Sequence, residues 1–157
     1  MNGRIQKLCR GFLAALAVAG TLVLGMSSAS AADLSWSANG TSLGGTGTWD
    51  TTNGRWGTSN PYNTIWNNVT NANDTAVFAG TAGTVTLSTP ITAGGLTFNT
   101  TNYSITGSTL TLAGASSPII NVSTGTSTIS SNIAGTNGLE KTGGGTIILS
   151  GTNNTYS

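Results

Sequence analysis

The sequence predicts an all-β fold, a solenoid of stacked coils that follows a cleaved secretion signal. After residue 31, apolar residues alternate with threonine, serine or asparagine in short runs, and glycine or polar turns separate these runs. Charge is nearly absent and β-branched residues are abundant, whereas disordered chains usually carry high net charge and few β-branched residues. Stacked strands around a thin apolar core are therefore favoured over disorder.

Residues 1–31 have the pattern of a secretory signal peptide. Basic side chains occur within residues 1–10, an apolar run covers residues 11–26, and small residues follow up to Ala32. We expect cleavage after Ala31, with cleavage after Ala32 as the alternative. The apolar run is shorter than the roughly 20 residues that a membrane-spanning helix needs, so a cleaved signal is favoured over a permanent anchor.

The mature chain, residues 32–157, carries little charge. Two basic and four acidic side chains give it a net charge of −2; they are Arg55, Lys141, Asp33, Asp50, Asp74 and Glu140. So few basic groups cannot neutralise a phosphate backbone, and this excludes nucleic acid as a partner. The only cysteine precedes the apolar run and leaves with the signal, so no disulfide is expected.

The titratable residues do not form a recognisable catalytic or metal centre. The chain has no histidine, which removes the usual general base, a Ser-His triad and most zinc sites. A glycosidase needs two carboxylates roughly 5–10 Å apart, and the four acids are spread along the chain. We interpret Asp50 and Asp74 as surface or turn carboxylates. The chain is expected not to be an enzyme and to have no catalytic, cofactor-binding or metal-binding residues.

Residues 32–80 contain all four tryptophans, among many glycine and asparagine turn signals. We interpret this segment as the amino-terminal cap of the solenoid, because the end of a stack exposes strand edges that bulky aromatic side chains can cover. Buried tryptophans also dominate the cores in which they occur. The alternative is a carbohydrate-binding surface, in which Trp49, Trp56 and Trp66 stack on sugar rings.

Residues 81–137 are predicted to form the coils, with one or two aliphatic side chains per strand pointing inward. Burial of each such side chain is worth roughly 1.5–3 kcal/mol. The pair Val85 and Leu87 recurs as Leu110 and Leu112 after 25 residues, and again at residues 147 and 149. These unequal intervals indicate irregular coils with loop insertions, about three of them up to residue 157.

The last segment, residues 138–157, reads GLEKTGGGTIILSGTNNTYS. Ile147 and Leu149 alternate inward on a strand, and the glycines of residues 143–145 permit a tight corner. This segment resembles the passenger-associated transport repeat of Gram-negative autotransporters, also called the autotransporter-associated β-strand repeat. The matching positions are Gly138, Leu139, Lys141, Gly143, Gly145, Leu149, Gly151, Asn154 and Tyr156, and Ile147 stands where the family usually has leucine.

The resemblance implies a right-handed parallel β-helix of the pectin-lyase-like kind. It also implies export through the Sec translocon and then through an outer-membrane β-barrel translocator of a longer parent, of which this chain is the amino-terminal piece. The repeat would support passenger folding and transport, and the passenger would be displayed at the cell surface or released from a Gram-negative bacterium. Two alternatives remain: a secreted carbohydrate-binding adhesin module that contacts surface glycans, and a polysaccharide-cleaving β-helix enzyme with catalytic groups beyond residue 157.

Overall fold

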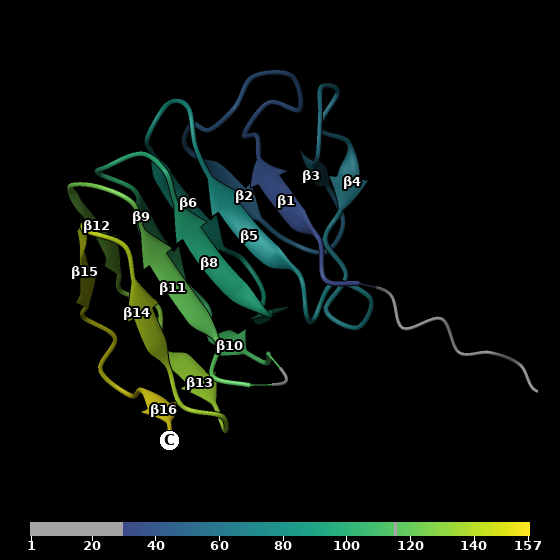
Figure 1. Cartoon of the computed structure of the whole chain (residues 1–157). Helices are drawn as coiled ribbons and strands as arrows, with labels where there is room; N and C mark the ends of the chain where they lie inside the picture. The colour runs from purple at the N-terminus through teal and green to yellow at the C-terminus, as the bar shows by residue number, and fades with distance from the viewer. Residues whose placement is uncertain (1–29, 115) are drawn as a thin grey trace, which may run out of the picture.

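The computed structural model describes residues 30–114 and 116–157, so nearly all of the predicted signal peptide lies outside the described residues. The described chain forms a parallel β-solenoid of about four turns, which confirms the predicted all-β fold (Figure 1). Apolar alternation with period 2 places one set of side chains inside each coil and the polar set outside. No helix capable of crossing a membrane occurs within these described ranges.

Each coil contributes one strand to each of three sheets, and every pairing between successive coils is parallel. The first two coils consist of β5 (Thr75–Phe78), β6 (Thr84–Leu87), β7 (Ile91–Ala93), β8 (Gly95–Phe98), β9 (Ser104–Gly107) and β10 (Leu110–Leu112). The next two consist of β11 (Ile119–Val122), β12 (Thr126–Ile129), β13 (Ile133–Gly135), β14 (Glu140–Thr142), β15 (Thr146–Leu149) and β16 (Thr155–Tyr156). The first coil therefore begins with β5, before residue 81.

Four strands precede the first coil: β1 (Asp33–Trp36), β2 (Gly47–Trp49), β3 (Gly54–Gly57) and β4 (Thr64–Ile65). β1 and β2 extend two of the sheets by pairing in parallel with β5 and β6. β3 then pairs antiparallel with β1, and β4 pairs antiparallel with β3. This antiparallel hairpin lies at one end of the stack, and β14, β15 and β16 lie at the other (Figure 1).

The strand register gives the length of one coil. Val85 pairs with Ile105, Ile105 with Ile129 and Ile129 with Leu149, so successive coils take 20, 24 and 20 residues. The longer interval contains the connection between β10 and β11, whereas Gly94 alone separates β7 from β8. The coils are thus more regular than predicted, with one longer connection, and they number four where about three were expected.

One predicted equivalence is wrong. Leu110 pairs with Ile91 and Ile133 in the four-stranded sheet, whereas Val85 lies in the five-stranded sheet. The segments around Val85 and Leu110 are therefore different sides of the solenoid and not the same position in successive coils. All three sides of a coil carry the same apolar alternation, and so the sequence pattern does not distinguish them. Leu149 does occupy the same sheet as Val85, as the pattern indicated.

The interior is one continuous apolar core in which side chains of successive coils stack. Its buried members are Leu34, Trp36, Trp49, Trp56, Trp66, Ala76, Phe78, Val85, Leu87, Ile91, Ala93, Leu96, Phe98, Tyr103, Ile105, Leu110, Leu112, Ile120, Val122, Ile129 and Ile133. Aromatic side chains fill the β1–β4 end and continue into the first two coils as Phe78, Phe98 and Tyr103, whereas the buried core members of the later coils are aliphatic. Phe78 and Phe98 join the two parts, because their rings stack with centroids 5.0 Å apart.

Candidate functional site

The tryptophan cluster occupies the interior of the β1–β4 end. Trp49, Trp56 and Trp66 have no exposed surface, and their ring centroids lie 4.6 to 4.9 Å apart. Such tilted and edge-to-face contacts stabilise aromatic pairs beyond the area they bury. A sugar cannot stack on a ring face without exposed surface, so burial contradicts the hypothesis that these three side chains form a glycan-contact surface. Their interior position agrees with the structural role predicted for them.

The four indole N–H groups differ in their partners. Trp36 Nε1 donates to the carbonyl oxygen of Gly45 and Trp66 Nε1 to that of Thr92, each at 2.9 Å. The Nε1 atoms of Trp49 and Trp56 are buried without a hydrogen-bond partner. The bond from Trp66 fastens the cluster to β7 of the first coil. This end of the solenoid is therefore tied to the coils by both packing and hydrogen bonding.

The candidate transport repeat, residues 138–157, forms the fourth coil. Ile147 and Leu149 are half-buried and pack against the core, as predicted, while Ile148 between them is 48% exposed. β14, β15 and β16 are the terminal strands of their three sheets. Each terminal strand presents one row of backbone N–H and C=O groups without a neighbouring strand, which is a template for further strand pairing.

Two glycines of this repeat are required by the corner between β14 and β15. Gly143 has φ of +74°, a conformation that side chains rarely adopt, and a Cβ there would overlap the carbonyl oxygen of Val122. A Cβ on Gly145 would lie 2.6 Å from Val122 Cγ1. By contrast, a Cβ on Gly144 would meet its nearest neighbour at 3.8 Å. The corner thus needs glycine at the first and third positions of the triplet.

The polar members of the repeat have structural contacts. Asn154 Oδ1 accepts a hydrogen bond from the backbone N–H of Ile133 at 2.8 Å, and its Nδ2 donates to the carbonyl oxygen of Gly151 at 3.1 Å. Lys141 Nζ donates to the carbonyl oxygen of Gly143 at 3.0 Å. Tyr156 lies at the surface with 37% of its area exposed. Asn154 thus fastens the last turn to the preceding coil.

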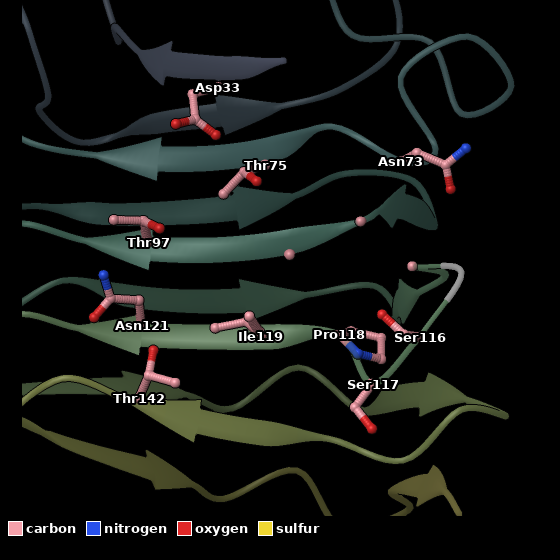
Figure 2. Close-up of a pocket in the computed structure, with 13 residues that line it drawn as sticks. Asp33, Asn73, Thr75, Thr97, Ser116, Ser117, Pro118, Ile119, Asn121 and Thr142 are labelled. Carbon is pink, nitrogen blue, oxygen red and sulfur yellow. The ribbon is translucent and has the colours of Figure 1, made fainter. Parts of the chain in front are cut away.

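A shallow groove of about 400 Å³ lies on the outer face of the seven-stranded sheet (Figure 2). Hydroxyl and amide groups from successive strands line it, among them Thr75, Thr97, Asn121 and Thr142. Its wall includes residues 116–118 of the longer β10–β11 connection, and the side-chain-free Gly94 and Gly95 also line it. The groove has no aromatic platform, and its polar atoms suit hydrogen bonding to a hydroxylated ligand. The groove is not evident from the sequence, because its lining residues come together only through the coil register.

The acidic side chains lie in separate environments. Asp50 follows β2 and accepts hydrogen bonds from Thr52 and Asn53. Burial raises the pKa of Asp50, but these hydrogen bonds outweigh it and leave the pKa below its ordinary value. Asp74 closes a turn, since its backbone N–H donates to the carbonyl oxygen of Asn71 at 3.0 Å, but it is only 7% exposed and so does not lie at the surface. No cluster of three or more potential metal ligands occurs among the residues that the structure describes.

Tyr103 makes structural hydrogen bonds that the sequence pattern does not predict. Its hydroxyl lies 2.7 Å from the carbonyl oxygen of Ala79 and 2.8 Å from that of Thr81. Burial raises the pKa of Tyr103 to about 12. The tyrosine thus bridges from its own coil to the corner of the preceding one, a contact that depends on which coils are neighbours.

Comparison with curated proteins gives a match over most of the chain. The chain is 50% identical over 148 residues to a protein named Adhesin BmaC autotransporter, from Brucella suis biovar 1 (strain 1330). This chain is similar to an autotransporter adhesin. The match covers 90% of the chain but only 4% of that relative, so the chain spans a small part of the relative's length. The similarity to an autotransporter, inferred above from residues 138–157, is confirmed over nearly the whole chain.

The other comparisons found nothing. No protein-family model matches the chain, so the assignment of residues 138–157 to the named transport repeat stays a prediction. No solved structure matches it either.

Proposed function

We propose that this chain is a non-enzymatic passenger segment of an adhesin-type autotransporter, exported by the Sec translocon and displayed at the surface of a Gram-negative bacterium. The 50% identity to an autotransporter adhesin over 90% of the chain is the main support. The parallel β-solenoid is a second, independent support. The predicted signal peptide at residues 1–31 agrees with the first export step.

Within this passenger, the fourth coil acts as the folding template for the chain that follows it in a longer parent. Its three terminal strands offer backbone groups for pairing, and Ile147 and Leu149 offer half-buried apolar surface for the next coil to cover. In a solenoid each repeat contacts only its neighbours, so folding can propagate coil by coil. Propagation outside the outer membrane would hinder backsliding of the passenger through its translocator.

Secretion of the full-length parent tests this role. The double substitution Ile147→Asp and Leu149→Asp places two carboxylates against the core and should sharply reduce the surface-displayed passenger. The matched control is Ile148→Asp on the same strand, which adds a charge at a 48% exposed position and should leave display near the parental level. Display is measured by protease accessibility on intact cells. Unchanged display of the double variant would contradict the proposed role.

Carbohydrate binding is the second candidate function, and the groove of Figure 2 is the feature that favours it. Its ladder of Thr97, Asn121 and Thr142 offers hydroxyl and amide groups to a glycan. The assay is calorimetric titration with bacterial and host glycans, because buried tryptophans would not report such binding by fluorescence quenching. Asn121→Ala should weaken binding, whereas Thr86→Ala, an exposed position on another sheet, should not. Absence of binding by the parent protein would remove this candidate.

A further inference from the structure

Asp74 is a buried carboxylate just before β5. Its Oδ2 accepts a hydrogen bond from Asn71 Nδ2 at 2.6 Å, and its Oδ1 accepts one from the backbone N–H of Ala32 at 2.8 Å. As long as the chain continues into the signal peptide, both of these donors are neutral amides. A buried carboxylate is best compensated by a positive charge in hydrogen-bond contact. One of the two donors is the backbone nitrogen of Ala32. This nitrogen is neutral within the peptide chain and would be a charged amine in a chain that begins at Ala32.

Ala32 is held by hydrogen bonds at both its backbone nitrogen and its carbonyl oxygen. Its carbonyl oxygen accepts a hydrogen bond from the backbone N–H of Thr75 at 2.8 Å, and its side chain packs against the core. The next residue, Asp33, is already in register with Thr75 in the β1–β5 pair. Ala31, by contrast, is exposed. Among the described residues, the Ala31–Ala32 peptide bond thus separates the exposed Ser30 and Ala31 from the packed solenoid.

We propose that signal peptidase cleaves the Ala31–Ala32 bond and that the new α-ammonium group of Ala32 forms an ion pair with Asp74. Hydrolysis by one water molecule leaves the new carboxylate on Ala31 of the released signal. The amine left on Ala32 takes up a proton at neutral pH. The neutral hydrogen bond to Asp74 then becomes a charge-assisted one, which is roughly twice as strong. This inference rests on the proposed export of the chain.

The same geometry selects between the two predicted cleavage positions. Cleavage after Ala32 would remove both the donor to Asp74 and the acceptor for Thr75. The mature chain would then begin at Asp33, whose α-ammonium is one residue further along β1. Cleavage after Ala31 keeps both hydrogen bonds and adds the charge. Cleavage at the Ala31–Ala32 bond therefore preserves the hydrogen bonds between Ala32 and the first coil and strengthens the one to Asp74.

Unfolding measurements on the mature chain test the ion pair. We compare residues 32–157 with a free amine against the same chain acetylated at Ala32, which keeps the N–H but removes the charge. A second comparison chain begins at Ala31, so that the Ala32 nitrogen is again a neutral amide. The free-amine chain should have an unfolding equilibrium constant about tenfold smaller than either comparison chain, given the greater strength of hydrogen bonds to charged groups. Equal constants in all three chains would overturn the ion pair.

Asp74→Asn provides the matched variant, because it removes the carboxylate charge and keeps a similar shape. In this background the free-amine and acetylated chains should unfold with equal constants, and a persisting difference would contradict the role of Asp74. The acetylation comparison in the parent chain remains decisive if the variant does not fold.

Mass spectrometry of the exported protein separates this inference from the proposed function. An amino terminus at Ala32 supports both, and an exported protein that begins elsewhere overturns only the inference. A full-length chain that stays in the cytoplasm overturns the proposed export.

Discussion

The buried hydroxyl of Ser127 gives the most direct test of the packing in these coils. Ser127 lies on β12 in register with Ile147, is 1% exposed, and its Oγ has no hydrogen-bond partner. A buried polar group without a partner costs about 1–3 kcal/mol of desolvation. Ser127→Ala removes that group and leaves only a void the size of one oxygen atom. We therefore expect the free energy of unfolding to rise by about 1 kcal/mol, at the lower end of that range.

Ser37 is the matched control, because it is equally buried but has partners. Its Oγ donates to the carbonyl oxygen of Ser42 at 2.7 Å. Ser37→Ala leaves that oxygen without its donor and should lower the free energy of unfolding by about 1 kcal/mol. The two alanine variants are thus expected to change stability in opposite directions, although each removes a single buried hydroxyl.

Urea unfolding followed by tryptophan fluorescence measures both variants, since all four indole rings pass from the dry interior to water on unfolding. Thermal unfolding is a second measurement of the same variants. A change of 1 kcal/mol in the free energy of unfolding should shift the thermal midpoint by roughly 4 °C in a domain of this size. A destabilised Ser127→Ala variant would refute the reasoning, because it would mean that the Ser127 hydroxyl is satisfied in the folded protein.

Three further predictions concern the tryptophans, a glycine corner and alkaline pH. Trp66→Phe should destabilise the protein by about 1–3 kcal/mol more than Trp49→Phe in urea unfolding, because the Trp66 indole donates a hydrogen bond and the Trp49 indole does not; equal losses would count against this. Gly143→Ala should lower the thermal midpoint while Gly144→Ala leaves it nearly unchanged, and a tolerated Gly143→Ala would show that the corner is not strained. The raised pKa of Tyr103, about 12, favours the neutral phenol in the folded state, so stability is unaffected below pH 10 and falls from there up to pH 12. Tyr103→Phe should remove this alkaline loss in a pH series of unfolding curves, and an unaltered pH profile would contradict the assignment.

Much of the fold could be predicted from the chain alone because strand alternation is local. Val85, Leu87, Ile147 and Leu149 point inward as expected, since side chains on a strand alternate with period 2 whatever the strand pairs with. The pairing partners could not be predicted in the same way, because the three strands of each coil carry similar patterns. The strand neighbour of Val85 is Ile105, which lies 20 residues further along the chain.

Features of the candidate sites that depend on a few consecutive residues could be predicted from the sequence, and features that depend on strand pairing could not. The glycine corner and the inward aliphatic residues of the repeat were evident, because each depends on a few consecutive residues. The groove of Figure 2 was not, because Thr97 and Asn121 become neighbours only when β8 pairs with β11. The turn at Asp74 was predictable from neighbouring residues, but the burial of its carboxylate was not. Its burial depends on Asn71, close in sequence, and on Ala32, which is 42 residues away.

The all-β class and the inward positions of each strand could be read from the chain alone, as could the prediction of a secretion signal, because these follow from composition and from periodicity over a few residues. The three-dimensional fold was needed to show which strands share a sheet, that the tryptophans have no exposed face, and that Asp74 contacts the nitrogen of Ala32. Those outcomes depend on contacts between successive coils, and the register of a coil is fixed by the packing of its whole core and not by any single segment.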